Sequence, residues 1–314
     1  MIERFVLLGA AGFVAPRHMK AIQQTGNQLI AALDPFDSVG VIDQYAPDAA
    51  FFTDFARFDR FVAKCQQSQD QLTYASICSP NYLHDMHIRF ALRSGLQVIC
   101  EKPLVINPWN LERLAKLAHQ TGLSVNTILQ LRLHPVVAQL RQDMMTNKTQ
   151  IADVELTYIT RRGKWYDYCW KGDETKSGGL LMNIGVHLFD LLLWLFGPVQ
   201  QSQLYVRTSR TASGYLQLAR ANIRWFLSVD ADQLPKGIRE QGMQTYRGLS
   251  VNGKEYEFSQ GFTDLHTTSY RKILSGQGFD MNQAKPAIAL VHQLRQEKRH
   301  SLTGDYHPFC QRVR

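Results

Sequence analysis

Short, uninterrupted apolar runs alternate with amphipathic segments through the first 130 residues. The runs Phe5–Leu8, Leu29–Leu33 and Tyr74–Cys78 have the length of single strands, and such continuous runs are typical of strands covered on both faces. The segments between the runs predict helices over 14–25 and about 82–93. Strands that alternate with helices predict a doubly wound parallel sheet, in which ligands bind beyond the carboxyl ends of the strands.

Later segments continue this rhythm. The run "QVICEKP" (97–103) predicts another strand, "SVNTILQ" (124–130) predicts a sixth, and 107–122 between them predicts a helix that begins at Asn107 and ends at Gly122. We therefore assign residues 1–130 to one domain. The side chains expected at strand ends, where a ligand would bind, are Ser79, Pro80, Asn81, Glu101, Lys102 and Gln130.

The pattern changes after residue 130. The segments 151–162, 202–209 and 214–230 are interpreted as longer strands, and the last of them alternates between apolar and polar residues. Strict alternation indicates a sheet with one buried and one open face, as in antiparallel sheets. We expect residues 131–314 to form a second α/β domain on a large, mostly antiparallel open sheet, whose open face is a candidate for oligomer contact.

The most apolar stretch of the chain, residues 180–196, contains three polar side chains. Its length suits one helix, and Asn183, His187 and Asp190 are then spaced i, i+4 and i+7 on one face. Such side chains are costly in lipid, so a membrane span is disfavoured. A lone histidine on an apolar helix is often a satisfied core residue, but its aligned neighbours and the flexible "KSGG" before the helix favour a functional His187.

Composition and charge narrow the function classes. The 314 residues carry a net charge of +8, with 45% hydrophobic and 20% charged residues, as in a globular protein of two domains. The basic residues do not form a long tract, which disfavours nucleic acid as a partner and leaves an anionic small molecule compatible. Five cysteines without a CxxC pair indicate reduced thiols rather than disulfides or a zinc site. The N-terminal apolar run resembles a signal peptide, but its glycines have another explanation, so we expect a cytoplasmic protein.

A glycine-rich turn links the first strand to the first helix. The segment "GAAGFVA" follows Phe5–Leu8, and Asp34 follows the second strand. This arrangement suits a dinucleotide, because glycine lets the backbone approach the pyrophosphate and an acid after the second strand accepts ribose hydroxyls. The spacing is GxxGxxA instead of GxGxxG, so a plain glycine turn, and an Asp34 that only opens a turn before Pro35, are the alternatives. A carboxylate at this position, with no Arg or Lys at 35–38, favours NAD over NADP.

Three motifs together resemble the Gfo/Idh/MocA oxidoreductase superfamily: the GxxGxxA turn, "EKP" (101–103) and "GG…NIGVHLFD" (178–190). Further segments resemble its branch of UDP-N-acetylglucosaminuronate 3-dehydrogenases of O-antigen biosynthesis, and they span nearly the whole chain: "GFVAPRH", "SPNYLHD", "LQLRLHP", "RGKWYDYCWKGDETKSGG", "RWFLSVD" and "FTDLHT". The resemblance implies an N-terminal Rossmann domain, NAD as the cofactor, and oxidation of the C3 hydroxyl of a UDP-linked uronate.

The resemblance also implies roles for individual residues. Lys102 would polarise the reacting oxygen, and His187 would accept the proton or relay it, so either could be the base. Asn183 stands where many members of the superfamily have Asp; because an amide does not exchange protons usefully, we expect it to bond the sugar. Asp190 is expected to orient His187 or to make a packing contact. The expected cofactor contacts are Gly9, Ala11, Gly12, Phe13, Val14, Asp34, Ser38, Ser79, Pro80, Asn81, His84, Glu101, Lys102, Gln130 and Trp165.

The basic segment 161–176 offers partners for a carboxylate and a diphosphate, although its residues could equally form a solvated loop. The resemblance further implies that 2-oxoglutarate reoxidises bound NADH and that the protein is a homotetramer packed through its second-domain sheets. The alternatives are a dehydrogenase of a free sugar or inositol, and a non-catalytic NAD-dependent sensor, which would typically lack Lys102 or His187. No metal site is expected. The expected substrate contacts are Lys102, Arg161, Lys164, Tyr166, Lys171, Ser177, Asn183 and His187.

Overall fold

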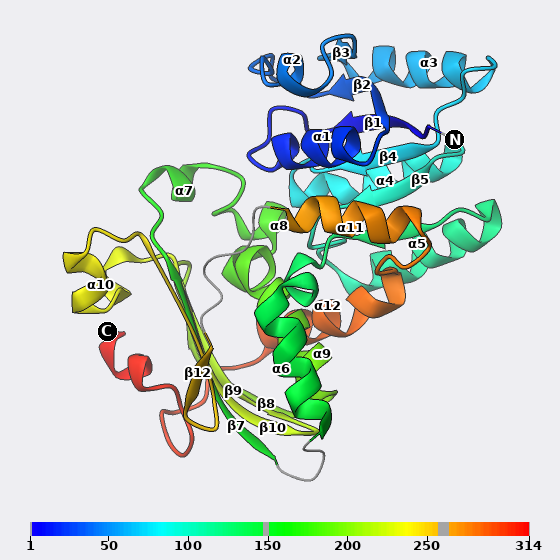
Figure 1. Cartoon of the computed structure of the whole chain (residues 1–314). Coiled ribbons are helices and arrows are strands. Elements are labelled where there is room, and N and C mark those ends of the chain that lie inside the picture. The colour runs from blue at the N-terminus through cyan, green and yellow to red at the C-terminus, as the bar shows by residue number, and fades with distance from the viewer. Residues whose placement is uncertain (1, 147–150, 257–263, 314) are drawn as a thin grey trace. The chain divides into compact units, whose positions relative to one another are not determined.

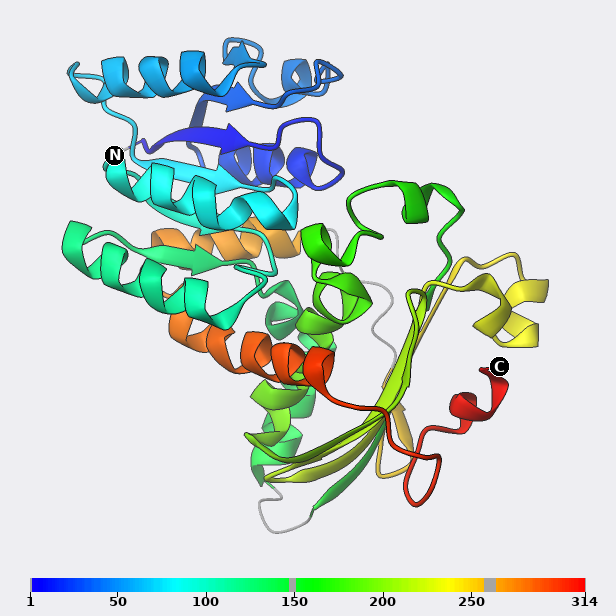
Figure 2. The same cartoon turned by 180° about the vertical axis from the view of Figure 1, so that it is seen from behind.

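The computed structural model describes residues 2–146, 151–256 and 264–313 (Figures 1 and 2). The chain divides into two compact units: unit 1 comprises Met1–Gln130 and Thr263–Lys285, and unit 2 comprises Leu131–Phe262 and Pro286–Arg314. The predicted assignment of all residues from 131 to 314 to one domain therefore differs from the compact units over residues 263–285. The roles assigned to the two domains remain predictions.

Unit 1 is built on a six-stranded sheet in the order β3-β2-β1-β4-β5-β6, with every neighbouring pair parallel. The doubly wound sheet predicted from the alternating apolar runs is thus confirmed. Its strands are β1 (Arg4–Leu8), β2 (Gln28–Leu33), β3 (Ala50–Phe52), β4 (Tyr74–Ile77), β5 (Gln97–Cys100) and β6 (Val125–Thr127).

Helices cover both faces of this sheet. Figure 1 shows α1 (Ala15–Gln24) beside α11 (Leu265–Leu274) on one face, and Figure 2 shows α4 (His84–Arg93) beside α5 (Pro108–Thr121) on the other. The helix α11 joins the core through Tyr270, whose ring lies 5.9 Å from that of Phe5 on β1. The other helical elements are α2 (Ile42–Tyr45), α3 (Phe55–Gln66), the 3₁₀ turn η1 (Asn81–Leu83) and the first residues of α12 (Met281–Gln296).

The predicted elements of unit 1 agree with the structure to within a few residues. The helix expected over 107–122 is α5, and Gly122 ends it in the left-handed conformation, with φ of +69°. Asn107 takes the extended N-cap backbone, but its side chain makes no capping hydrogen bond. The predicted sixth strand is shorter than expected, and the elements β3, α3 and α11 were not predicted.

Unit 2 contains a mixed six-stranded sheet in the order β12-β11-β7-β10-β9-β8, in which β7 and β10 are parallel and all other neighbours antiparallel. This confirms the large, mostly antiparallel sheet. Its strands are β7 (Ala152–Thr160), β8 (Val199–Arg207), β9 (Thr211–Leu218), β10 (Ala221–Ser228), β11 (Thr245–Val251) and β12 (Lys254–Tyr256).

The segment 214–230, interpreted from its sequence as one strand, is a hairpin. Leu218 of β9 pairs with Ala221 of β10, so only two residues form the turn, and neither is glycine or asparagine, the usual signal of a tight hairpin. The predicted buried face of β10 is correct, with Trp225 fully buried. The predicted open face is wrong at Ser228, which is buried, and Phe226, the apolar exception to the alternation on that face, is buried as well.

The apolar stretch that begins at residue 180 is helical, as predicted, but it is not one regular α-helix. Leu181–Gly185 form a π-helical turn (η3), and α9 (Val186–Phe196) follows. By length and composition the helical segment Glu174–Phe196 could cross a membrane, yet most of it is buried within the protein. It packs on the sheet, since the Phe189 ring meets that of Trp225 edge-on with centroids 5.1 Å apart.

Unit 2 contains further helical elements besides η3 and α9. They are η2 (Gln130–Leu133), α6 (Pro135–Thr146), α7 (Trp165–Tyr168), α8 (Glu174–Ser177), η4 (Ala231–Gln233), α10 (Lys236–Glu240), the rest of α12 and η5 (Pro308–Arg312). Of these, α6 packs against α9.

Candidate active site

The glycine turn after β1 accepts no side chain at its first position. Gly9 has φ of +100°, and a Cβ atom there would lie 2.5 Å from the backbone nitrogen of Ser79. Its N–H donates to the carbonyl of Leu33 at 2.8 Å, and Gly12 donates back to Gly9 at 3.1 Å. The turn is therefore packed against the ends of β2 and β4, with α1 beginning directly after it. This close backbone approach, followed by a helix N-terminus, fits a dinucleotide pyrophosphate.

Asp34 connects this turn to the end of β2. Its Oδ2 accepts from the Ala11 N–H and its Oδ1 from the Phe36 N–H, both at 3.0 Å. The second bond closes the turn at Pro35, which is the structural role considered from the sequence, and the first fixes the carboxylate beside the glycine turn. The ribose contact expected of Asp34 remains a prediction. Of the other residues predicted near it, Phe13 is exposed, Val14 half-buried, and Ser38 exposed.

His84 is buried, and its ring contacts the backbone of two turns. Its Nδ1 lies 2.7 Å from the Pro103 carbonyl and its Nε2 2.8 Å from the Ser79 carbonyl. Burial lowers the pKa of His84, against the effect of these two acceptors, which favour the protonated ring. Predicted as a cofactor contact, His84 here joins the turn after β4 to the turn after β5. Ser79 also forms a side-chain hydrogen bond, because its Oγ lies 2.8 Å from Nδ1 of His87.

The residues after β5 are held by a buried carboxylate. Glu101 Oε1 lies 2.8 Å from His266 Nε2 and 3.2 Å from His18 Nε2, and its Oε2 accepts from the Lys102 backbone N–H at 3.2 Å. Burial alone would raise the pKa of Glu101, but the hydrogen bonds from His18 and His266 outweigh it and hold this pKa well below its usual range. The bond between Lys102 and Pro103 is cis.

In unit 2, Asn183 and His187 lie on different kinds of helix. Asn183 belongs to the π turn and donates from Nδ2 to the Tyr166 hydroxyl at 3.5 Å, a long contact. His187 lies in the first turn of α9, and its ring meets that of Tyr158 edge-on at 6.2 Å. The i, i+4 spacing predicted for a regular helix therefore does not apply across Gly185, where the π turn inserts an additional residue.

Asp190 is bound by an arginine that was not predicted as a site residue. Arg132 donates from Nε to Asp190 Oδ2 at 2.9 Å and from Nη2 to Oδ1 at 2.6 Å, and both side chains are buried. Burial raises the pKa of Asp190, and the guanidinium opposes that effect. The two roles considered for Asp190, orienting His187 or making a packing contact, stay predictions. Arg132 lies within "LQLRLHP", one of the segments that resemble the family. That resemblance was the feature of the sequence from which Arg132 could have been identified.

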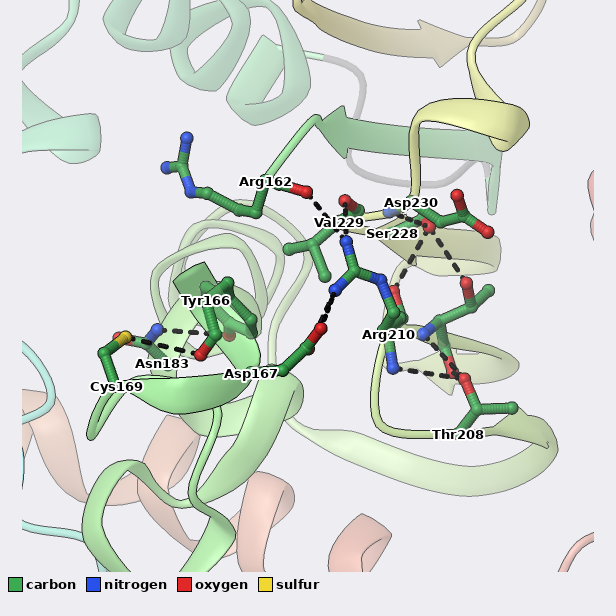
Figure 3. Close-up of polar contacts among 11 residues, drawn as sticks. Arg162, Tyr166, Asp167, Cys169, Asn183, Thr208, Arg210, Ser228, Val229 and Asp230 are labelled. Carbon is green, nitrogen blue, oxygen red and sulfur yellow. Dashed lines mark hydrogen bonds and ion pairs between the residues drawn. The ribbon is translucent and has the colours of Figure 1, made fainter. Parts of the chain in front are cut away.

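Figure 3 shows a second arginine that organises the basic segment 161–176. Arg210 donates from Nη1 to both carboxylate oxygens of Asp167 at 2.8 Å, and from Nη2 to the Arg162 carbonyl at 2.8 Å and the Val229 carbonyl at 3.3 Å. It thereby ties both ends of the segment 162–167 to the turn before β9. Tyr166 lies inside this segment and is buried.

The predicted substrate residues of this segment differ in exposure. Lys171 Nζ lies 5.6 Å from the Trp165 ring centroid and 5.7 Å from that of Trp170, and burial lowers the pKa of Lys171. Lys164 is exposed, and Trp165 is half exposed. Ser177 is buried, and its Oγ donates to the Asp173 carbonyl at 2.8 Å.

Arg161, also exposed, donates from Nη1 to the Gln244 side chain at 3.0 Å. The remaining predicted cofactor contacts lie near the strand ends of unit 1: Pro80 precedes η1, Asn81 begins it, and Gln130 begins η2. Lys102 belongs to unit 1 and His187 to unit 2, so the pairing of these two residues stays a prediction.

The buried residues His18, His266 and Tyr270 of unit 1 were missed, although the first two lie in segments that resemble the family.

Comparisons with known proteins agree with this arrangement. Residues 3–128 match a family model described as "Oxidoreductase family, NAD-binding Rossmann fold", and residues 149–229 match one described as "Oxidoreductase family, C-terminal alpha/beta domain". The structure has all five cysteines free.

Among solved structures, the chain is similar to the WlbA (WbpB) dehydrogenase from Thermus thermophilus. In complex with NAD and alpha-ketoglutarate, that protein is 46% identical with a TM-score of 0.95, and the match covers 98% of this chain and 100% of that chain. In complex with NAD and UDP-GlcNAcA, it is 45% identical with a TM-score of 0.94, over the same shares.

Curated relatives match over shorter stretches. An uncharacterized oxidoreductase of Synechocystis is 30% identical over 40% of this chain, and a D-glucoside 3-dehydrogenase of Escherichia coli is 29% identical over 39%. The chain covers only 34% and 35% of the length of these two relatives. The matches to both domain models and to a solved structure over its whole length nevertheless agree: the chain belongs to the Gfo/Idh/MocA oxidoreductase family.

Proposed function

We propose that the protein is an NAD-dependent dehydrogenase that oxidises the C3 hydroxyl of UDP-N-acetylglucosaminuronic acid (UDP-GlcNAcA) to a ketone. One observation carries this proposal: the 45% identity, over 98% of the chain, to a dehydrogenase solved in complex with NAD and UDP-GlcNAcA. The unit 1 turn supports the cofactor, because Gly9 and Gly12 leave backbone room for a pyrophosphate and Asp34 offers a carboxylate at the end of β2.

Oxidation of a secondary alcohol requires a proton acceptor at the hydroxyl and an oriented hydride acceptor. NAD, when bound, supplies the hydride acceptor. Lys102, fixed by the Glu101 bond to its backbone, would stabilise the negative charge that develops on the reacting oxygen. His187 would take the hydroxyl proton or relay it from Lys102. Asn183 would bond the sugar, since an amide cannot take the proton.

The anionic groups of the substrate would bind to the segment 161–176. Lys171 is the strongest candidate, because a half-buried ammonium whose pKa is lowered by burial gains most from an incoming anion. Arg161 and Lys164 are exposed and could reach a phosphate or a carboxylate. Tyr166 and Ser177 are buried, so we assign them to the sugar end of the site.

The second proposed half-reaction regenerates the cofactor. Its support is the complex of the Thermus thermophilus dehydrogenase with NAD and alpha-ketoglutarate. The C3–H hydride of the sugar would pass to NAD and then to the ketone carbon of 2-oxoglutarate. The proton released from the C3 hydroxyl balances the one that the new hydroxyl of 2-hydroxyglutarate takes up. The sum converts the sugar alcohol and 2-oxoglutarate to the 3-keto sugar and 2-hydroxyglutarate, with no external oxidant.

We place this reaction in the synthesis of O-antigen sugars in the cytoplasm, with the protein as a homotetramer packed through the unit 2 sheets. A free-sugar dehydrogenase is the second candidate, because a curated relative from Escherichia coli is a D-glucoside 3-dehydrogenase. The two differ in the need for the basic segment: replacing Lys171 with Met should impair oxidation of a nucleotide sugar and leave that of a free sugar unchanged.

The test incubates the purified protein with NAD, 2-oxoglutarate and either UDP-GlcNAcA, a free glucoside or inositol, and follows the organic acids and the sugars by mass spectrometry. Loss of two hydrogens from the nucleotide sugar, with an equal amount of 2-hydroxyglutarate, is the expected result. Oxidation of free glucosides or inositol instead would establish the second candidate. Bound NAD without turnover of any of these substrates would contradict both and favour a sensor.

A further inference from the structure

Five side chains from four separate parts of unit 1 form a buried hydrogen-bonded chain that ends at Lys102. The helix α1 supplies His18, α11 supplies His266 and Tyr270, β4 supplies Ser76, and the end of β5 supplies Glu101. Each of the five is at most 6% exposed. Apart from the hydrogen bond between Glu101 and the Lys102 backbone, the proposed roles of Lys102 and His187 do not use this chain of groups, which we call the Glu101 network.

The distances give the network one arrangement of protons. An ionised Glu101 only accepts, so His18 and His266 both donate to it from Nε2. A neutral His18 then accepts at Nδ1, so the Tyr270 hydroxyl, 2.7 Å away, donates to it. Tyr270 in turn accepts from the Ser76 hydroxyl at 2.6 Å. Every polar hydrogen therefore has an acceptor, which is the condition under which a buried polar network is rigid.

The electrostatics agree with this arrangement. Burial lowers the pKa of His18, and this effect exceeds the raising effect of Glu101. The His18 ring is therefore neutral at neutral pH. Burial raises the pKa of Tyr270 well above its usual value, so the phenol keeps its proton. The carboxylate of Glu101 remains charged because its hydrogen bonds outweigh the effect of burial.

A buried charge of this kind is weak evidence for stability, because apolar replacements of similar volume are often as stable. The second oxygen of Glu101 indicates another use, since it bonds the backbone N–H of the residue that the proposed function places at the reacting oxygen. We propose that His18, His266 and Tyr270 are positioning residues that hold Glu101, and through it Lys102, in the geometry that the reaction needs. This inference rests on the proposed role of Lys102.

The same side chains could be considered as a metal site, because the ligand atoms of His18, Glu101 and His266 lie within 4.8 Å of one another. A cation would need the lone pair of His18 Nε2, which places the proton on Nδ1 and reverses the hydrogen bond with Tyr270. The hydrogen-bonded network instead places a proton between each histidine and Glu101. Elemental analysis of the purified protein distinguishes the two: a stoichiometric metal would overturn our proposal.

The central experiment replaces His266 with Ala and with Gln. Alanine removes one donor to Glu101, whereas the side-chain amide of glutamine can restore it. In single-turnover measurements of NADH formation from bound NAD and UDP-GlcNAcA, we expect His266→Ala to slow the reaction by about 10²-fold, the cost of a reacting group misplaced by about 1 Å. His266→Gln should recover most of the rate, and the Kd for NAD should be unchanged in both variants.

His307→Ala is the matched control. His307 is also a fully buried histidine, with its Nε2 2.8 Å from Thr157 Oγ1, but it belongs to unit 2 and is not one of the five side chains of the Glu101 network. This variant should lower the Tm and leave the single-turnover rate intact at temperatures where the protein is folded. Equal loss of rate in His266→Ala and His307→Ala, or no rescue by glutamine, would show that the network only stabilises the fold.

Hydrogen–deuterium exchange of a peptide that contains Lys102 separates this inference from the proposed function. The Glu101 bond should protect the Lys102 amide, and His266→Ala should speed its exchange whether or not UDP-GlcNAcA is the substrate. A wild-type protein inactive on UDP-GlcNAcA would refute the proposed function, and the exchange result would still decide the anchoring. Unchanged exchange at Lys102 would refute the anchoring.

Discussion

Replacing Arg132 with methionine should destabilise the protein by about 3–5 kcal/mol, because it leaves the Asp190 carboxylate buried without its partner. Two hydrogen bonds, of 2.9 and 2.6 Å, join these side chains, which are only 7% and 3% exposed. Water therefore cannot replace the lost donors. Methionine keeps most of the volume of the arginine stem, so the loss is mainly electrostatic, together with the contact of Arg132 with the Trp194 ring at 5.9 Å.

The loss should depend on pH. Burial raises the pKa of Asp190 even while Arg132 opposes it, so removing Arg132 should raise this pKa further. A carboxyl whose pKa is higher in the folded than in the unfolded state contributes stability below its unfolded pKa, and this contribution disappears as the pH rises through the folded pKa. The deficit of Arg132→Met relative to wild type should therefore grow between about pH 5 and about pH 8.

Urea unfolding, followed by tryptophan fluorescence at both pH values, measures this deficit. The double variant Arg132→Met/Asp190→Leu removes the charge as well as its partner, and should regain most of the lost stability. Two results would refute the reasoning: a deficit that does not change with pH, or a double variant as unstable as the single one. Either would mean that Asp190 is solvated or neutral in the folded protein.

Three further predictions concern the site. Lys102→Ala should lower turnover by about 10²–10⁴-fold and leave the NAD affinity measured by calorimetry intact, as expected of a group that acts on the reacting oxygen. Arg210→Met should raise the KM for the nucleotide sugar more than it changes kcat, because it frees Asp167 and its segment, whereas Arg224→Met, which breaks ion pairs on β10, should leave both unchanged. Gly9→Ala should weaken NAD binding by at least about tenfold in the same calorimetric assay, since φ of +100° costs alanine about 1–2 kcal/mol and its Cβ meets the Ser79 backbone.

Most strands and helices of the first 130 residues could be predicted because they are marked locally in the sequence, whereas β3 and α3 were missed. Continuous apolar runs give the buried strands, and Gly122 gives the end of α5. The contribution of residues 263–285 to unit 1 could not be predicted in this way. It depends on side chains far apart in sequence, such as Ser76 and Tyr270, which are separated by 194 residues.

The candidate site shows the same limit. Lys102 and His187 lie in short motifs that can be recognised, whereas the groups that hold the neighbours of Lys102 and His187 are far from those neighbours in sequence. Arg132 is 58 residues from Asp190, and Arg210 is 43 residues from Asp167. The π turn before α9 was also missed, because the hydrophobic pattern of a buried helix is nearly uniform and does not reveal an additional residue in one turn.

The two residues proposed at the reacting carbon each lie close in sequence to a buried carboxylate. Glu101 precedes Lys102 and is fixed by histidines, and Asp190 lies one turn after His187 and is fixed by Arg132. Apolar residues of similar volume could supply about as much stability as these buried ionic groups do. Restraint of the geometry at Lys102 and His187 therefore explains the two carboxylates better than stability does. The basic segment 161–176 is held instead at its exposed edge, by Arg210. Substitutions at the buried carboxylates should therefore act mainly on kcat, and those in the basic segment mainly on KM.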